Sequence, residues 1–272
     1  MEQFVLICVA SDVTRVGPYI FQSGNSILPS TLDPYCGPAP TLQNALSSWN
    51  LDPVLIACIA GVAVAFHHAA PLQRGWKTGL LVFLLIAAFV SPLCAMTSAL
   101  FSIRLAHHIL LGSVIAPFVV MTGWPKQRWL AKIPLEAIFV AHTAIYWVWH
   151  LPFGYAFALS GTWQYWVMQI ALIVASILLW QALLSRSMSV VATTSLALGT
   201  MVQMGFLGAI LTFAPVTLFK AHFATTQAFG LTPLEDQQLA GVLMWTLGFA
   251  PYALVVLWCT RTRLLHPRPA EQ

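Results

Sequence analysis

The chain has 272 residues, of which 59% are hydrophobic and 7% are charged, and its formal net charge is +4. An ordinary soluble domain carries roughly 25% charged residues, so this composition excludes a soluble globular fold. Several uncharged runs reach the roughly 17 to 25 residues that a helix needs to cross a bilayer. The basic residues lie beside these runs, as in loops retained in the cytosol, which argues against nucleic-acid binding. We therefore expect an all-α, polytopic helix bundle in a lipid bilayer.

Three parts are expected along the chain. Residues 1–48 contain prolines and glycines, and no basic residue precedes their short apolar patch, which argues against a standard signal peptide. We expect them to form an outer N-terminal tail. Residues 49–263 hold the long apolar runs and form the predicted transmembrane domain of seven helices. Residues 264–272 form a short cytosolic tail.

The first two spans are predicted at about residues 52–67 and 76–93. Asp52 can cap the first helix, and Pro53 suits its first turn. Pro92 lies near the end of the second run, where a proline is expected to stop a helix because it cannot donate a backbone hydrogen bond.

The third span, residues 101–123, is an apolar run with an unusual polar content. It carries Arg104, His107 and His108 in its first third. Pro117 predicts a kink in its second half. Ionisable groups inside a membrane are costly and usually face the bundle interior or a water-filled cavity. We therefore expect this helix to contribute to a polar site.

Four further spans complete the predicted bundle. Glycines in the sixth span, at positions 199, 205 and 208, allow close approach of neighbouring helices. Thr232 and Glu235 have the spacing of a capping box at the start of the seventh span. The predicted ranges are about 134–150, 163–184, 190–213 and a last helix from residue 232 to about residue 260.

Lysine and arginine are distributed unequally between the loops on the two sides of this bundle. By the positive-inside rule the richer side is cytosolic, so the N-terminus lies outside and the C-terminus lies in the cytosol. The cytosolic set has nine bases (Arg74, Lys77, Lys126, Arg128, Lys132, Arg186, Arg261, Arg263 and Arg268), and the outer set has three (Arg15, Arg104 and Lys220).

This topology sorts the histidines by depth. His107, His108, His150 and His222 lie toward the outer face, and His142 lies near the middle of the membrane. Imidazole, thiolate and thioether groups suit a soft or borderline ion such as Cu(I). The sequence therefore predicts a copper site at His108, His150, His107 and His222, to which Cys36, Cys94 and Met96 are also available. The alternative for each histidine is an ordinary hydrogen bond inside the bundle, and for His67, His68 and His266 it is contact with headgroups or solvent.

Other polar and sulfur-containing residues have structural interpretations. The five cysteines show no CxxC pair and no even-numbered framework, so no disulfide or zinc ribbon is predicted. Cys58 and Cys259 are expected to be lipid-facing or packed thiols. Asp236 is expected to cap a helix. Methionines 168, 201, 204 and 244 are expected to fill the core.

No motif indicates an enzyme. The chain has no nucleophile elbow, no phosphate-binding loop and no dinucleotide fingerprint, and it holds eight carboxylate residues in total. We therefore predict no catalytic residues.

Six motifs together resemble one known family, the multi-span cytochrome c oxidase assembly factors called CtaG. The resemblance covers about residues 49–263. The motifs are WNLDP (49–53), SPL (91–93), FS....HHILL....AP (from 101), WHLP (149–152), GAILTFAP (208–215) and DQQLAGVLMW (236–245).

The resemblance implies a seven-span protein of the bacterial inner membrane that helps to mature haem-copper oxidases and assists copper delivery on the periplasmic side. Its implied partners are cytochrome c oxidase subunits and a periplasmic copper chaperone. His108 matches the second histidine of the family pattern HxxQH, and His150 matches the histidine of WHxP. Arg104 and His107 replace the first histidine and the glutamine of HxxQH, and Gln169 stands where relatives often carry a histidine.

Alternative functions remain open from the sequence. Two histidines at matching depth on facing helices also fit the axial ligands of a haem-binding electron carrier. A copper or small-solute transporter requires polar residues along both halves of the membrane. Scaffolding of the oxidase without metal binding is a further alternative.

Overall fold

The computed structural model describes residues 34–69, 74–122, 133–185 and 189–265, with side chains described up to Thr262. These residues all belong to one compact unit, residues 32–272. Several predictions fall on positions outside the described residues: those for tail residues 1–33, His266, Arg15, Lys126, Arg128, Lys132, Arg186 and Arg268.

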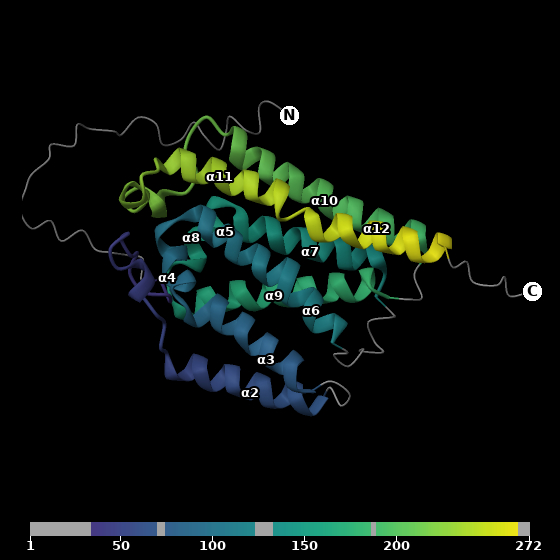
Figure 1. Ribbon diagram of the computed structural model, residues 1–272. Helices are drawn as coiled ribbons and strands as arrows, with labels where there is room; N and C mark the ends of the chain where they lie inside the picture. The colour runs from purple at the N-terminus through teal and green to yellow at the C-terminus, as the bar shows by residue number, and fades with distance from the viewer. Residues whose placement is uncertain (1–33, 70–73, 123–132, 186–188, 266–272) are drawn as a thin grey trace, which may run out of the picture. The chain divides into compact units, whose positions relative to one another are not determined.

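Every regular element in the described ranges is helical. Figure 1 shows α10, α11 and α12 on one side of the bundle and α2 and α3 on the opposite side, with α5, α7 and α9 between them. The elements are η1 (Ala45–Ser47), α2 (Pro53–Ala69), α3 (Arg74–Leu85), η2 (Ile86–Val90), α4 (Pro92–Ala99), α5 (Phe101–Ile109), η3 (Leu110–Ile115), α6 (Ala116–Met121), α7 (Leu135–His150), α8 (Pro152–Ala158), α9 (Thr162–Leu183), α10 (Val190–Phe213), η5 (Lys220–His222), η6 (Thr226–Phe229), α11 (Pro233–Thr246) and α12 (Ala250–Leu265).

The protein is a multi-pass membrane protein. Each of the seven predicted spans coincides with helical structure in the described residues. Two of them are short, because Pro53–His68 falls below the length of a typical span and α7 has 16 residues. The number of seven membrane crossings therefore stays a prediction. Helical stretches long and apolar enough to cross a membrane are Gly75–Ala99, Phe101–Met121, Thr162–Leu183, Val190–Phe213 and Pro233–Thr262.

The second predicted helix ends beside Pro92, as predicted, but a new helix begins there at once. Helix α3 continues as the π-helix η2 and breaks at Ser91, and Pro92 is the first residue of α4. The side chain of Ser91 accepts a hydrogen bond from Leu93 N–H at this new helix start. A proline at the first helical position loses nothing, because that N–H has no intrahelical partner.

The last predicted span is not one continuous helix. It divides into α11 and α12, with a break at residues 247–249. A Cβ on Gly248 would lie 2.5 Å from the Met244 carbonyl oxygen, so the backbone turns tightly there. The predicted start is confirmed, because Thr232 and Glu235 form both hydrogen bonds of a capping box.

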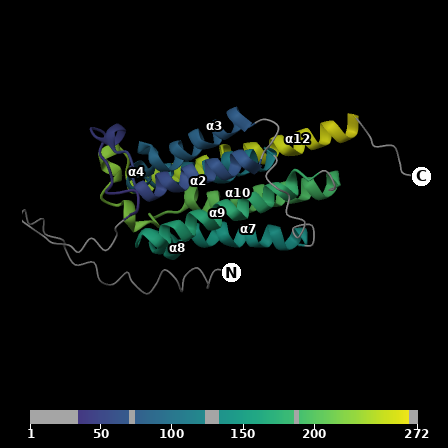
Figure 2. The same cartoon turned by 90° about the horizontal axis from the view of Figure 1, so that it is seen from below.

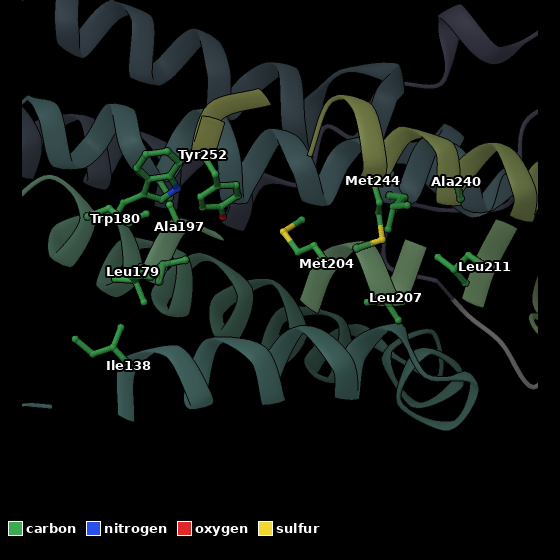
Figure 3. Packing of buried hydrophobic residues seen from close by; sticks show 14 of the residues in the cluster. Ile138, Leu179, Trp180, Ala197, Met204, Leu207, Leu211, Ala240, Met244 and Tyr252 are labelled. Atoms are coloured by element: carbon green, nitrogen blue, oxygen red, sulfur yellow. The ribbon is translucent and has the colours of Figure 1, made fainter. Parts of the chain in front are cut away.

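Helices α10 and α11 meet at a seam of small residues. A Cβ on Gly208 would lie 3.1 Å from the Gly241 carbonyl oxygen, and one on Gly241 would lie 2.5 Å from that of Gly208. The predicted close approach is confirmed. Beside the seam, Met204 and Met244 pack among buried apolar residues (Figure 3), in agreement with their predicted role as core filler.

A disulfide joins the described end of the predicted outer tail to the helix bundle. Residues 34–48 are described and lie at the same end of the bundle as α4 and α8 (Figures 1 and 2). Cys58 is exposed and Cys259 is buried, and both are free thiols, as predicted. Cys36 and Cys94, however, form a disulfide across 58 residues. The prediction of no disulfide was wrong, and these two sulfurs are not available as thiolate ligands.

Candidate functional site

Two of the predicted site histidines are in direct contact. His108 Nδ1 on α5 lies 3.2 Å from His150 Nε2 at the end of α7. His150 Nδ1 lies 2.7 Å from the carbonyl oxygen of Tyr146, to which it donates. His150 Nε2 is therefore the acceptor, and His108 Nδ1–H is the donor. This tautomer leaves a lone pair on His108 Nε2, which is buried and has no hydrogen-bond partner among the described residues.

The contact also bears on the haem alternative. Axial ligands of one haem lie on opposite faces of the porphyrin, with the iron between them. The facing nitrogens of His108 and His150 are hydrogen-bonded directly, so no porphyrin plane fits between these two rings in this arrangement.

His107 lies next to His108 in sequence and has a different role. Its Nε2 lies 3.1 Å from the carbonyl oxygen of Ala88, in the π-helix η2. That carbonyl cannot pair four residues ahead, because Pro92 has no N–H. His107 therefore donates to a carbonyl that the helix leaves unpaired, and its ring packs edge-on against Phe89.

A second π-helix follows the histidines directly. In η3, Ala116 N–H donates to the carbonyl oxygen of Leu111, five residues earlier. The next bond of this π-helical pattern would join the Gly112 carbonyl to Pro117. It cannot form, because proline has no N–H. Trp180 Nε1 on α9 donates to that carbonyl at 2.8 Å instead. The disturbance predicted near Pro117 thus takes the form of a π-helix, a feature often found at functional sites.

His222 is separate from the histidine pair. Its Nε2 lies 2.6 Å from Tyr155 Oη, and its Nδ1 lies 3.2 Å from the carbonyl oxygen of Ala99. Burial lowers the pKa of His222 to about 4, with a further contribution from the positive charge of Arg104. Burial likewise raises the pKa of Tyr155 to about 12. His222 is therefore neutral at pH 7 and tied to two partners.

Arg104 is a buried cation, with 1% of its surface exposed. Its Nε donates to the carbonyl oxygen of Thr97 at 3.2 Å. Its guanidinium carbon lies 5.8 Å from the ring centres of both Tyr155 and Tyr165. Neither Nη1 nor Nη2 has a hydrogen-bond partner in the described part of the chain.

Asp236 does not neutralise Arg104. Its carboxylate accepts hydrogen bonds from Phe101 N–H, from Ser102 N–H and from the Ser102 hydroxyl. Asp236 thus caps the N-terminus of α5, where a negative charge is favoured by the helix dipole. The prediction of a capping role is confirmed, although the capped helix is not its own.

Other buried polar groups near these residues also lack partners. Gln169 follows Tyr165 by one turn of α9, and neither atom of its side-chain amide is hydrogen-bonded within the described ranges. Both ring nitrogens of His142 also lack a partner in the described part of the chain, and its ring stacks on that of Tyr146 with 4.4 Å between the ring centres. We call Arg104, His108, His142, His150, Tyr155, Tyr165 and Gln169 the polar cluster.

The polar cluster is not a preformed multidentate metal centre. Among the described residues, no three His, Cys, Asp or Glu side chains gather in a group that could hold a metal ion. The structure brings His108 and His150 together, whereas His107 and His222 make hydrogen bonds elsewhere. Of the predicted four-histidine site, the pair alone is assembled.

The disulfide lies beside the polar cluster. Cys36 Sγ lies 3.6 Å from Tyr165 Oη, and Thr97 Oγ1 lies 3.9 Å from the same sulfur. Both cysteines are buried. The covalent bond therefore fixes the segment before α2 against α4 and over the tyrosine that faces Arg104.

A family comparison bears on this arrangement. Residues 137–264 match the family model of the cytochrome c oxidase caa3 assembly factors (Caa3_CtaG). The matched segment, slightly less than half of the chain, is similar to this family. It contains His150 and the WHLP, GAILTFAP and DQQLAGVLMW motifs, so the predicted CtaG resemblance is confirmed there. The motifs before residue 137, and His108 with them, lie outside the match. Neither the curated proteins nor the solved structures include a significant match.

Sequence reasoning missed the two tyrosines of the polar cluster. Tyr155 and Tyr165 are buried residues that flank the guanidinium of Arg104. One signal was available, because Tyr165 and Gln169 are four residues apart and therefore share a helix face. The sequence does not indicate that this face points toward α5, since that depends on how the helices pack.

Proposed function

We propose that this CtaG-family protein takes part in cytochrome c oxidase assembly and holds copper transiently as cargo near the outer face of the membrane. The family match supports the role in oxidase assembly. The contact between His108 and His150 carries the copper proposal, because their facing nitrogens are 3.2 Å apart. Ligands of a single ion need nitrogen atoms within roughly 4 Å of each other.

The pair has the chemistry that a transient site requires. Copper taken up between the facing nitrogens displaces the proton from His108 Nδ1, and that proton moves to the free Nε2 of the same neutral ring. Binding therefore weakens when acid protonates the imidazoles, because protons then compete with the metal. Imidazole suits copper, and the hydrogen bond from His150 Nδ1 to Tyr146 holds that ring in place, as outer-shell partners commonly do. A two-ligand site exchanges its ion more readily than a closed site with four ligands.

The disulfide supports the proposed orientation. Disulfides persist in oxidising compartments and are rare in the cytosol. Cys36 and Cys94 lie at the end of the bundle that holds α4 and α8 (Figure 1). This end therefore faces outward in the proposal, in agreement with the positive-inside count. In a bacterium the outward side of the inner membrane is the periplasm, where an oxidase subunit receives its copper.

Copper binding tests the proposal directly. The purified protein is loaded with Cu(I), and bound copper per chain is measured for the wild type and for the double variant His108→Ala with His150→Ala. We expect the double variant to lose most of the bound copper. The matched control is His67→Ala with His68→Ala, because both of these histidines are exposed on α2.

The outcomes separate this proposal from scaffolding. Unchanged copper stoichiometry in the His108/His150 variant would reject the ligand assignment. If this variant still copurifies with oxidase subunits and the oxidase assembles fully with its copper, the protein acts as a scaffold. A Soret band in the purified protein would indicate haem instead.

A further inference from the structure

Within the described ranges, the guanidinium of Arg104 has no counter-ion, and its two terminal nitrogens make no hydrogen bond of ordinary geometry. It is almost fully buried, and no carboxylate lies within ion-pair distance of it among the described residues, since Asp236 is occupied at the start of α5. A buried unpaired charge is expensive, and such a residue usually pairs with an opposite charge. Arg104 therefore needs an anion that the described chain does not supply.

The free atoms indicate the kind of anion. Nε is used by Thr97, so Nη1 and Nη2 remain as two parallel donors at the tip of the side chain. Two such donors match the two oxygens of a carboxylate in bidentate geometry. The rings of Tyr155 and Tyr165, both 5.8 Å from the guanidinium carbon, restrict the space beside it. A planar anion fits this arrangement better than a tetrahedral one.

A pocket is lined in part by sequence neighbours of the residues that contact Arg104 and Tyr155. Its volume is about 170 Å³, and Ser98, Leu159 and Ala221 are among its lining residues. Ser98 follows Thr97, which bonds Arg104, and Ala221 precedes His222, which bonds Tyr155. The Ser98 hydroxyl is buried and has no partner in the described residues. Two lining residues of the pocket are thus adjacent in sequence to Thr97 and His222, and one of them, Ser98, has a buried hydroxyl without a partner in the described chain.

We propose that Arg104 binds a small carboxylate, of the size of formate or acetate, through Nη1 and Nη2, and that the pocket at Ser98 is its entrance. The bound carboxylate supplies the missing negative charge. This inference does not rest on the copper proposal, because neither His108 nor His150 contacts the proposed anion and the test below uses no metal.

The test compares carboxylates with chloride at matched ionic strength. The thermal unfolding midpoint of the purified full-length protein is measured while sodium formate or sodium acetate replaces sodium chloride. We expect the wild-type midpoint to rise saturably with the carboxylate, because a ligand that binds the folded state stabilises it. We expect no such rise for Arg104→Met. The control Lys220→Gln removes an exposed cation beside Ala221 and should respond like the wild type.

Two results would overturn the inference. One is a wild-type midpoint that responds equally to formate and chloride, and the other is an Arg104→Met variant that keeps the full carboxylate response. If Arg104→Met does not fold, the NMR line width of ¹³C-formate in solutions of the wild-type protein shows whether formate binds. Saturable broadening that acetate reverses and chloride does not supports the site, and its absence rejects it.

Discussion

Two buried glutamines in different regions of the bundle differ in the number of hydrogen bonds that they make. Gln237, on α11 beside the α10–α11 seam, accepts from Leu218 N–H at 2.7 Å and donates to the Leu211 carbonyl at 3.2 Å. Gln169, on α9 in the polar cluster, has neither amide atom paired within the described chain. Each side chain is 1% exposed. Two equally buried amides therefore differ in hydrogen bonding, because Gln237 ties two backbone groups together at the seam and Gln169 makes no hydrogen bond of ordinary geometry in the described chain.

The polar cluster, however, has a covalent support that the seam lacks. Replacing both Cys36 and Cys94 by alanine opens a 58-residue loop in the unfolded state. We expect this double variant to lose about 4 kcal/mol of unfolding free energy by the chain-entropy estimate. Denaturant titration of the purified protein measures the loss. The single-site control Cys58→Ala changes an exposed free thiol and should cost little. If both variants unfold at the same midpoint, the disulfide does not support the fold.

Adding one methyl group at Gly241 tests how closely α10 and α11 pack at the seam. Gly241→Ala would place a Cβ 2.2 Å from Thr212 Oγ1 and 2.5 Å from the Gly208 carbonyl oxygen, so α10 and α11 have to separate. We expect a loss of about 3 kcal/mol, at the upper end for overpacking. Gly61→Ala is the matched control, because nothing lies within 4 Å of its added Cβ on α2, and alanine should stabilise that helix slightly. A seam that tolerates Gly241→Ala as well as Gly61→Ala is not close-packed.

The two glutamines give the sharpest test of the comparison. Gln237→Leu leaves a buried N–H and a buried carbonyl without partners, which we expect to cost about 2 to 3 kcal/mol. Gln169→Leu removes an amide that makes no hydrogen bond of ordinary geometry to any described residue, so its cost should be smaller. Unfolding midpoints of the two variants measure the difference. An equal loss in both variants would show that Gln169 has partners comparable to those of Gln237.

How far the sequence predicts this architecture depends on the range of the interactions involved. Helix α10 was predicted at its observed bounds, residues 190–213, and the capping box at Thr232 follows from contacts within one turn. The partnership of His108 with His150 was also predicted, because the alternation of spans places both at one depth. Local pattern and topology suffice for these features.

The features that were missed depend on contacts between distant segments. Cys94 lies on α4 and Cys36 lies in a turn before η1, and pairing between cysteines cannot be deduced from their spacing. His107 resembles a metal ligand in sequence, yet its role follows from a carbonyl on another helix that Pro92 leaves unpaired. Likewise, Trp180 is needed at Gly112 because of the π-helix there. The last two cases require knowledge of which backbone carbonyls remain unpaired, and all three depend on contacts that exist only in the folded chain.

The smallest expected effect concerns His222, which is hydrogen-bonded both to Tyr155 and to the Ala99 carbonyl oxygen. It is measured as the pH dependence of the unfolding free energy. Burial lowers the pKa of His222 from 6.5 to about 4, so the unfolded chain binds this proton more readily than the folded chain. The stabilising contribution is complete above pH 6.5 and is lost as pH falls toward 4. Between pH 7 and pH 5 we expect a loss of about 2 kcal/mol from this group. His222→Gln should remove that part of the pH dependence, whereas the exposed control His68→Gln should retain it. Parallel curves for His222→Gln and the wild type would mean that the pKa of His222 is the same in the folded and the unfolded chain.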